Sequence, residues 1–316
     1  MATQRIGFLL VPGFSLSALS GATEPLRIAN RVDQEELYRC DLISIDGRRV
    51  TSNGGFCLLP NLSIDDECEF SIVFIVSSLD AAKFQYQRAI DWLRDLAARG
   101  CKLGGLGCGT VLLARAGLLN GHHFTLPWQL LWDFVEEFPD TEVRRDLFCI
   151  DRDRLTSAGG TAGLDLILAF IEDQRGRETA IKVAEELAYT HIRPPEECQR
   201  MAVQWRYEVT DRRVVNCITL MEDNIEQPVP IVTLAHIVGL SPRELERVFK
   251  REFGCSPSRF YLELRLKRAQ ELLTHSTNSI LSIALECGFS DGSHLGKYYR
   301  EIFHQTPGCV RRSKRA

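Results

Sequence analysis

The sequence predicts an α/β domain followed by an all-α domain that contains two helix-turn-helix units. In the first half of the chain, apolar runs of strand length alternate with amphipathic helical segments, and in the last third a pattern of two short helices occurs twice. The 316 residues are enough for two domains. We place the first domain at residues 1–176, a connecting helix and exposed linker at 177–213, and the helical domain at 214–316.

The first domain is expected to contain a doubly wound, flavodoxin-like parallel sheet. Strands that alternate with helices pair in parallel, and helices then cover both faces of the sheet. Ligands of such sheets bind outside the carboxyl ends of the strands, so the turn at 105–110 is predicted to border a pocket. The strands are expected at 5–12, 38–45, 70–76 and 101–106, and the helices at 17–30, 84–98 and from 111 onward.

The stretch Val232–Phe253 has the pattern of a helix, a tight turn and a second helix. Gly239 ends the first helix, and Ser241 and Glu244 have the spacing of a capping box at the start of the second. Pro242 occupies the first turn of that helix, where its missing N–H costs nothing. Apolar residues at helical spacing then leave the polar residues together on the outer face. Such a face is the one that enters a major groove in DNA-binding helix-turn-helix units.

The stretch Ile280–Phe303 repeats this pattern. Gly288 matches Gly239 at an offset of 49 residues, and the offset becomes 50 after a one-residue insertion in the second turn. A single helix-turn-helix pattern also occurs in ordinary helix bundles, whereas two copies with polar outer faces in register indicate DNA binding. The side chains expected on the two outer faces are Arg243, Glu246, Arg247, Lys250, Ser293, His294, Lys297 and Arg300.

Two kinds of DNA contact are expected from these side chains. Those near the starts of the recognition helices reach base edges, where Arg is the commonest reader of guanine, and those further along suit phosphates. Glu246 either accepts a hydrogen bond from cytosine or neutralises a neighbouring Arg, and the second interpretation is favoured. The expected base readers are Arg243, Arg247 and Lys297, with Ser293 and His294 as secondary candidates, and the phosphate contacts are Lys250 and Arg300.

Residues from about 215 onward resemble the DNA-binding domain of the AraC/XylS family of transcription regulators. The matching stretches are LAHIVGLSPRELERVFKREFGCSPSRFYLELRLKRAQELL and SILSIALECGFSDGSHLGKYYREIFHQTPG. The resemblance implies seven helices, with one helix-turn-helix unit on either side of a long linker helix at roughly 257–273. It also implies that the two recognition helices enter successive major-groove segments about one helical turn apart, and that duplex DNA and RNA polymerase are partners.

Composition is consistent with a cytoplasmic DNA-binding protein. The formal net charge is −4, but residues 215–316 hold 14 Lys and Arg against 11 Asp and Glu, so the basic excess lies with the helix-turn-helix units. No run approaches the roughly 20 apolar residues of a membrane span, and the first residues do not resemble a signal peptide. The 11 Cys show no zinc-binding spacing, so we expect reduced thiols, no metal and no cofactor.

Residues from about 5 to 175 resemble the class I glutamine-amidotransferase-like domain of the ThiJ/PfpI superfamily, on the stretches GGLGCGTVLLARAGLLNG, FTLPW and FCIDRDRLTSAGGTAGLDLILAFI. Joined to an AraC-type domain, this is the layout of the GlxA-like branch of regulators. In relatives that are enzymes, the strand-to-helix turn carries a nucleophilic Cys with a His nearby. Here Gly107 holds the elbow position, Cys108 follows one residue late, and Pro127 stands where His is expected. No catalytic residue is therefore expected, and a cysteine-dependent hydrolase or amidotransferase with a DNA-targeting tail is the alternative.

The first domain is expected to bind a small-molecule effector. The stretches GATEPLRIANR, ELYRCDLISIDG and VTSNGG resemble regulators of carnitine, glycine betaine and arginine catabolism, which implies an activator of a catabolic operon. A homodimer through this domain is expected because an isologous dimer is the usual symmetric solution. A carboxylate and an aromatic face would together suit a cationic ligand. Two alternatives stay open: Glu24 pairs with Arg27 or Arg31 on its own helix, and Trp128 packs in the core. The expected ligand contacts are Glu24, Gly107, Cys108, Gly109, Trp128 and Thr161.

Overall fold

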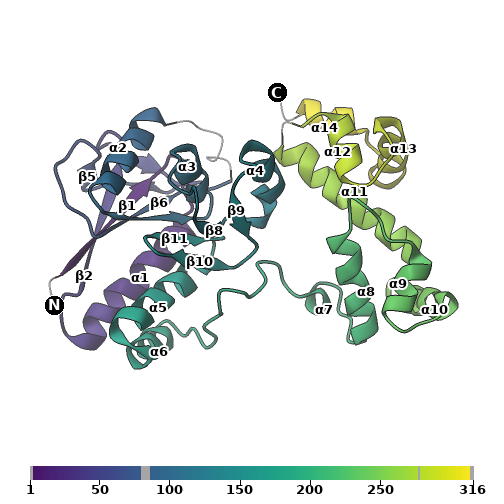
Figure 1. Ribbon diagram of the computed structural model, residues 1–316, viewed down its shortest axis with the longest axis horizontal. Coiled ribbons are helices and arrows are strands. Elements are labelled where there is room, and N and C mark those ends of the chain that lie inside the picture. The colour runs from purple at the N-terminus through teal and green to yellow at the C-terminus, as the bar shows by residue number, and fades with distance from the viewer. Residues whose placement is uncertain (1–2, 80–85, 277, 314–316) are drawn as a thin grey trace. The chain divides into compact units, whose positions relative to one another are not determined.

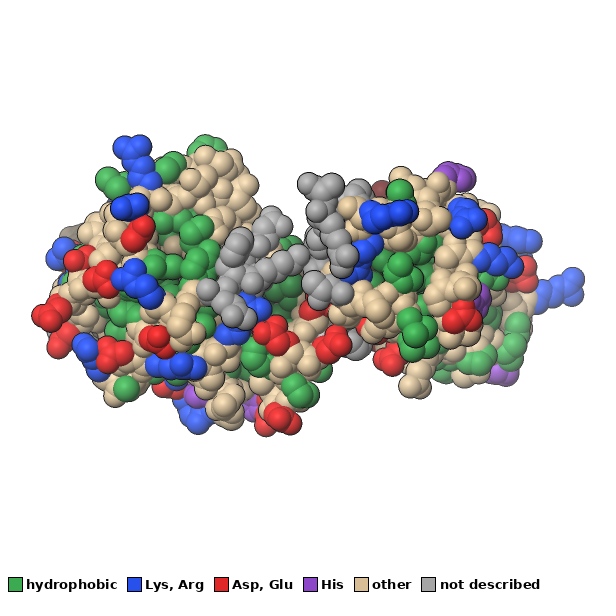
Figure 2. Space-filling model, turned by 90° about the horizontal axis from the view of Figure 1, so that it is seen from above, with side chains coloured by type: hydrophobic (Ala, Val, Ile, Leu, Met, Phe, Trp, Pro, Cys, Tyr) green, Lys and Arg blue, Asp and Glu red, His purple; other side chains and the backbone are tan. Residues whose placement is uncertain are grey.

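The computed structural model of the protein describes residues 3–79, 86–276 and 278–313, and the chain divides into two compact units between Arg200 and Met201 (Figure 1). The first unit is α/β and the second is helical, as the sequence predicts. On the face that Figure 2 shows, Lys and Arg side chains of both units are interspersed with Asp and Glu, in agreement with the small net charge of −4.

The first unit is built on a sheet whose strand order is β10-β11-β7-β6-β1-β2-β5. All neighbouring strands run parallel except β10 and β11, which form an antiparallel pair at one edge. Two small pairs, β3–β4 and β8–β9, lie outside this sheet. The strands of the main sheet are β1 Gln4–Leu10, β2 Tyr38–Ser44, β5 Leu62–Ser63, β6 Ile72–Val76, β7 Lys102–Leu106, β10 Phe148–Asp151 and β11 Arg154–Ser157, and the small pairs are β3 Val50–Thr51 with β4 Cys57–Leu58 and β8 His123–Thr125 with β9 Glu142–Arg144.

Helices cover both faces of the main sheet (Figure 1). Successive residues of a strand point to opposite faces, and β6 shows this directly. Phe74 packs with α1, α5 and α6, whereas its neighbours Val73 and Ile75 pack with α2 and α3. This doubly wound arrangement confirms the predicted flavodoxin-like sheet. The helices are α1 Leu16–Asp33, α2 Gln87–Ala98, α3 Gly109–Arg115, α4 Leu131–Glu137, α5 Ala162–Arg175 and α6 Arg177–Glu186, with a short 3₁₀ turn, η2, at Trp128–Leu130.

The segment 177–213, predicted to connect the domains, is instead divided between the two units. Helix α6 belongs to the first unit, because Ala180, Val183 and Ala184 are buried in the core that α1 and α5 share. The chain from Met201 belongs to the second unit, where Val203 and Val209 are buried. Helix α2 begins at Gln87, and the predicted start of that helix at 84 lies outside the described residues.

The second unit has two hydrophobic cores that share one long helix, α11. The first half of α11 contributes Phe260 and Leu264 to one core, and the second half contributes Leu266 and Leu273 to the other. Helix α11 is therefore the predicted linker helix, two residues longer than expected. The seven helices that the AraC resemblance implies are α8 Arg212–Asp223, α9 Ile231–Ile237, α10 Pro242–Phe253, α11 Pro257–His275, α12 Ile280–Glu286, α13 Gly292–Phe303 and α14 Pro307–Ser313, and a short helix α7 at Val203–Arg206 precedes them.

Among the described residues, no helix is both long enough and apolar enough to span a lipid bilayer. Over the same residues, no cluster of His, Cys, Asp and Glu side chains is arranged to hold a metal ion.

Candidate nucleic-acid interface and effector region

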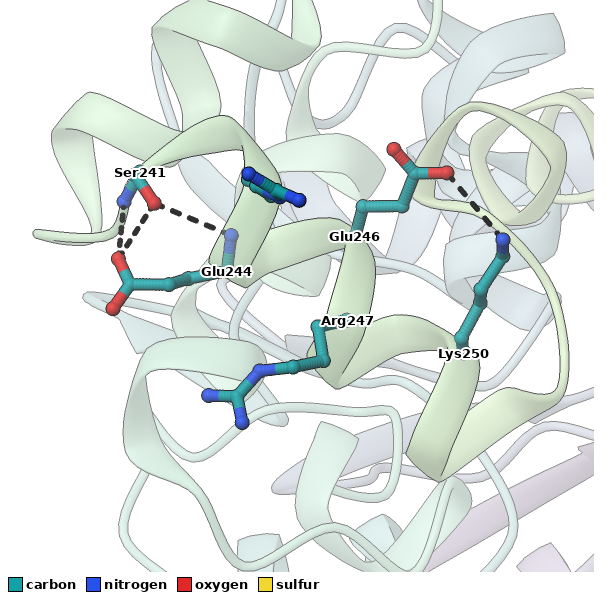
Figure 3. A pocket seen from close by; sticks show the side chains of 6 residues that line it. Ser241, Glu244, Glu246, Arg247 and Lys250 are labelled. Atoms are coloured by element: carbon teal, nitrogen blue, oxygen red, sulfur yellow. Dashed lines mark hydrogen bonds and ion pairs between the residues drawn. The ribbon is translucent and has the colours of Figure 1, made fainter.

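The first recognition helix, α10, begins with the predicted capping box (Figure 3). Ser241 Oγ accepts a hydrogen bond from the Glu244 amide at 3.2 Å, and the Glu244 carboxylate accepts from the Ser241 amide at 2.9 Å. Ser241 Oγ also donates to the Glu244 carboxylate at 2.7 Å. This bond, and after it the one from the Ser241 amide, holds the pKa of Glu244 below its ordinary value. The box satisfies two amides that the first helical turn would otherwise leave unpaired, so the start of α10 is fixed.

The apolar side of α10 lies in the core and its polar side faces solvent. Leu245, Val248 and Phe249 are buried, as the spacing predicts. The opposite side borders an open hollow, and Figure 3 shows side chains of this face spread along the helix. The structure therefore brings together the four predicted outer-face residues of the first helix-turn-helix unit. With Ser241 and Glu244, the hollow is lined by Arg243, Glu246, Arg247 and Lys250.

The sequence favoured a neighbouring Arg as the partner of Glu246, but in the structure its partner is a Lys. Its carboxylate lies 3.8 Å from Lys250 Nζ, one helical turn further along α10. Both side chains are more than half exposed, and exposed pairs of this kind contribute little to stability. The ammonium of Lys250 can therefore exchange this carboxylate for a phosphate at small cost, while Arg243 and Arg247 remain on the same exposed face.

The second recognition helix, α13, starts with a different cap. Asp291 accepts a hydrogen bond from the His294 amide at 2.8 Å, and this bond is the main cause that lowers the pKa of Asp291. Leu295 and Tyr299 are buried on the inner side. On the outer side three of the predicted contacts are exposed, namely Ser293, Lys297 and Arg300.

The side chain of His294 packs against neighbouring residues instead of pointing freely into solvent. Its Nδ1 lies 3.0 Å from Ser290 Oγ, and its ring packs edge-on against Phe289 at 5.5 Å and tilted against Tyr298 at 5.3 Å. Lys297 Nζ in turn lies 5.4 Å from the centre of the Tyr298 ring. The Nδ1 atom of His294 is thus already engaged within the protein, and the ammonium of Lys297 lies near an aromatic ring.

A residue that the sequence did not single out, Arg265 on α11, holds the second turn in place. Its guanidinium donates to the carbonyl oxygens of Cys287 at 2.8 Å and Gly288 at 2.5 Å, and it stacks over the Phe289 ring at 4.2 Å. Burial lowers the pKa of Arg265. These carbonyls lie at the carboxyl end of helix α12, where the last carbonyl oxygens of a helix lack an intrahelical donor, and the guanidinium provides that donor. In a sequence, one Arg within a charged linker helix gives no signal of this role.

The predicted elbow after β7 has the expected backbone geometry. Gly107 has a φ of +62°, which favours glycine, and a Cβ there would come within 3.3 Å of Gly159. At Gly109 a Cβ would meet the Ile75 carbonyl oxygen at 2.1 Å, so only glycine fits. Cys108 is 3% exposed at the start of α3. The tight turn at the carboxyl end of β7 is confirmed, and the thiol beside it is buried.

Among the described residues, no hydrogen bond or ion pair joins Glu24, Thr161 and Trp128 to one another. Glu24 pairs with Arg27 at 2.7 Å on α1, which was the alternative interpretation, and 42% of its side chain is exposed. Thr161 is exposed at the start of α5, next to the Gly159–Gly160 turn that touches the elbow. Trp128 is partly buried in turn η2. The elbow and Thr161 are therefore neighbours, whereas Glu24 is directed to its own helix.

The end of the first unit, residues 189–200, contacts two of these predicted ligand residues, and we name this segment the strap. Arg193 donates to Thr161 Oγ1 at 2.7 Å. The Gln199 carboxamide accepts a hydrogen bond from the Trp128 amide at 2.8 Å, and the guanidinium of Arg200 lies 4.6 Å from the Trp128 ring centre. The Pro and Glu residues of this segment predict an exposed linker, whereas the structure shows it in contact with the first domain.

Fold and site together define a class of protein. A flavodoxin-like domain with a glycine elbow is joined to a helical unit with two polar recognition helices, which is the construction of a DNA-binding regulator with a sensory domain. Comparison with family models agrees: a DJ-1/PfpI family model matches residues 4–173, and a helix-turn-helix domain model matches residues 234–313.

Full-length relatives place the chain in one family. It is 38% identical to the HTH-type transcriptional regulator CdhR of Pseudomonas aeruginosa over 305 residues, which span 96% of this chain and 90% of that protein. It is 38% identical to GbdR of the same species over 304 residues, 96% of this chain and 83% of that protein, and 32% identical to GlxA of Rhizobium meliloti over 310 residues, 98% and 96%. The chain belongs to this family of HTH-type transcriptional regulators with a DJ-1/PfpI domain.

Solved structures agree with the assignment. An AraC family transcriptional regulator from Pseudomonas putida superposes with a TM-score of 0.55 at 29% identity, over 58% of this chain and 99% of that one. DJ-1beta of Drosophila melanogaster, at 19% identity and a TM-score of 0.51 over 60% of this chain and 100% of that one, shows the fold alone. The full-length relatives are named as regulators and not as enzymes, so the alternative of a DNA-targeted hydrolase is set aside.

Proposed function

We propose that this regulator senses a small cationic metabolite, an amine or a quaternary ammonium compound, and activates transcription of a catabolic operon in the cytoplasm. In this proposal the chain binds promoter DNA as a homodimer and recruits RNA polymerase. The observation that carries the ligand class is the contact at Trp128. A guanidinium already lies 4.6 Å from the centre of that ring, which means that the indole face accepts a cation.

The DNA contacts are proposed for the two outer faces. Arg243 and Arg247 on α10 and Lys297 on α13 read base edges, with Ser293 in a secondary role. This division is supported by the exposure of these side chains and by the donor geometry of Arg, which matches the two acceptors of guanine in the major groove. The phosphate contacts are Lys250 and Arg300, which lie further along each helix. His294 and Glu246 are given supporting roles, since His294 already has Ser290 as a partner just before its helix and Glu246 has Lys250 within its own.

The effector is proposed to bind near the elbow and Trp128. The glycine turn 107–109 and Thr161 provide backbone and hydroxyl groups for a polar end of the ligand, and the indole provides the cation subsite. The buried Cys108 contributes packing rather than chemistry, because no base stands where Pro127 replaces the expected His. Glu24 is left out of this proposal, since its carboxylate is paired with Arg27.

Isothermal titration of the full chain with betaine, carnitine, choline, dimethylglycine and arginine tests the ligand class. We expect one of them to bind, and to bind at least tenfold more weakly to Trp128→Ala, while Trp205→Ala, a change at an exposed indole in the second unit, leaves the affinity unchanged. No heat from any of the five compounds would remove the proposed ligand class. Promoter binding measured with and without the bound compound then tests whether it acts as an effector.

A further inference from the structure

The strap, residues 189–200, is the last segment of the first unit, and the next residue, Met201, begins the DNA-binding unit. Besides the Pro195 carbonyl, which accepts a hydrogen bond from the Leu147 amide, three side-chain attachments hold it. The attachments differ in burial and in the strength of their chemistry, and the difference determines which part of the strap a ligand can release.

The first attachment is buried and strong. Asp165, which is 0% exposed, accepts hydrogen bonds from Tyr189 Oη at 2.8 Å, from the Arg193 amide at 2.9 Å and from the Arg193 guanidinium at 2.6 Å. Burial raises the pKa of Tyr189 to about 12, so its hydroxyl stays a neutral donor. Removing these donors would leave a buried carboxylate without a counter-charge, which is strongly unfavourable. This end of the strap therefore stays in place.

The second attachment is the side-chain amide of Gln199. It donates to Thr125 Oγ1 at 3.1 Å, to the Leu126 carbonyl at 3.1 Å and to the Asp146 carbonyl at 2.8 Å, and its oxygen accepts from the Trp128 amide. These are neutral hydrogen bonds of a partly buried group. Each has a modest net value, because water can replace it when the strap moves.

The third attachment is the contact of Arg200 with Trp128. The guanidinium lies 4.6 Å from the ring centre, and Arg200 itself is an exposed residue. Exposed cation–π contacts belong to the weaker end of their range. A ligand cation that stacks on the same ring face must take the place of this guanidinium, since one face of an indole holds one cation at stacking distance.

We propose that the indole face of Trp128 is the cation subsite of the effector and that Arg200 is its occupant in the ligand-free chain, so that a quaternary ammonium or guanidinium effector displaces Arg200. This inference rests on the proposed function, which places the ligand at Trp128. Displacement removes the last attachment before Met201 and weakens that of Gln199, while Asp165 keeps Arg193 in place. The ligand thus shifts the population of the strap's final residues toward a released state, directly before the DNA-binding unit.

Because the internal cation competes with the ligand, removing it should tighten ligand binding. Glycine betaine and L-arginine are titrated into the full chain, into Arg200→Ala and into a matched surface variant, Arg99→Ala, whose guanidinium is 70% exposed and pairs with Asp95. We expect Arg200→Ala to bind its ligand about two- to fivefold more tightly, the factor that follows from an exposed cation–π contact. Arg99→Ala should match the parent chain. If Arg200→Ala and the parent chain bind the ligand with equal affinity, Arg200 does not compete with the ligand for Trp128 and the proposal is wrong.

A second measurement needs no ligand. The Trp128 amide is bonded to the Gln199 side chain, and the Leu147 amide is bonded to the Pro195 carbonyl nearer the fixed end of the strap. Hydrogen exchange should become faster at Trp128 in Arg200→Ala and remain unchanged at Leu147, and Arg99→Ala should alter neither. Unchanged exchange at Trp128 would overturn the role of Arg200 in attaching the strap.

The two measurements separate the inference from the function on which it rests. If neither compound binds the parent chain but exchange at Trp128 rises in Arg200→Ala, the ligand class is wrong and the attachment stands. If a compound binds and Trp128→Ala binds it equally well, the subsite is wrong even though an effector site exists.

Discussion

The two helix-turn-helix units of this protein have the same pattern of helices, but they differ in how many side chains contact the turn instead of facing solvent. Recognition helices α10 and α13 each have 12 residues, and both bury two equivalent positions, Leu245 with Phe249 in α10 and Leu295 with Tyr299 in α13. In the first unit the outer face presents Arg243 and Arg247 to solvent. In the second, His294 is engaged with Ser290 and two aromatic rings, and the turn is held from outside by Arg265. From this comparison we expect the first helix-turn-helix unit to make most of the base contacts, and the second mainly to fix the position of the protein on the DNA.

The turns themselves show the same contrast. Gly239 and Gly288 both have a positive φ, +70° and +71°. A Cβ at Gly239 would meet no atom within 4 Å, whereas at Gly288 it would come within 2.7 Å of the Ile225 carbonyl oxygen and 2.8 Å of Pro228. The turn at Gly239 is open, and the turn at Gly288 is packed against Ile225 and Pro228, which precede the first helix-turn-helix unit. The one-residue insertion in the second turn thus lies in the more enclosed of the two.

The largest expected effect is a difference between two glycine substitutions. Gly239→Ala has only the backbone cost of a left-handed alanine, about 1–2 kcal/mol. Gly288→Ala adds an overlap with backbone atoms that cannot move aside. We therefore expect it to lower the local free energy of unfolding of α12 and α13 by about 3 kcal/mol or more. Native-state hydrogen exchange on the full chain measures both. Equal losses of protection in the two variants would show that the second turn is as open as the first.

Next in size is the loss of the Arg265 contacts. Arg265→Met removes two hydrogen bonds from a charged donor and one stacking contact, which together are expected to cost about 2–3 kcal/mol of local stability. Discrimination should fall at the base positions under α13 and persist at those under α10, which a binding-site selection experiment resolves. Lys267→Met, at an exposed position of the same helix, is the control. A uniform loss over both halves of the site would mean that Arg265 supports the whole unit and not the second turn.

A smaller effect is expected from the base readers of the first unit. Arg247→Ala should lower specific affinity by about 1–3 kcal/mol and change the preferred base at its position. The matched change Arg300→Ala, at a proposed phosphate contact, should weaken binding to all sequences alike and reduce the salt slope by about one. An unchanged sequence preference for Arg247→Ala would refute its assignment as a base reader.

The smallest effect concerns the caps and pH. The folded-state pKa of Asp291 lies below its ordinary value of 3.8, so its contribution to stability is present above that value and is lost as the pH falls through the folded pKa. Helix α10 keeps its Ser241 cap when Glu244 is protonated, whereas α13 has the carboxylate alone. On acidification from pH 5 to pH 3, exchange protection in the first turn of α13 should therefore fall more than in α10. Asp291→Asn, which caps without a charge, should abolish this difference, and the same pH profile in the variant would contradict the role of the carboxylate.

The local elements of this protein follow from its sequence, because they depend on contacts between residues that are close along the chain. The apolar run Ile72–Val76 predicts a strand covered on both faces, and the Ser241–Glu244 spacing predicts the start of α10 to the residue. The duplicated pattern likewise places Arg243 and Arg247 on one exposed face, because helical periodicity alone decides which side of an amphipathic helix is buried. The glycine elbow at Gly107 and the absence of a His at Pro127 are equally matters of local sequence.

Pairings between distant residues were decided only by the tertiary structure. The sequence could not tell whether Glu24 would turn toward the elbow or toward Arg27, since both partners were within reach of a flexible side chain. It gave no sign that Arg265 would close α12, that α6 would pack with α1, or that Arg200 would cover Trp128, because those contacts join segments separated by turns whose geometry sets the outcome. A side chain's periodicity fixes the face it occupies, but what it meets there depends on how other elements pack.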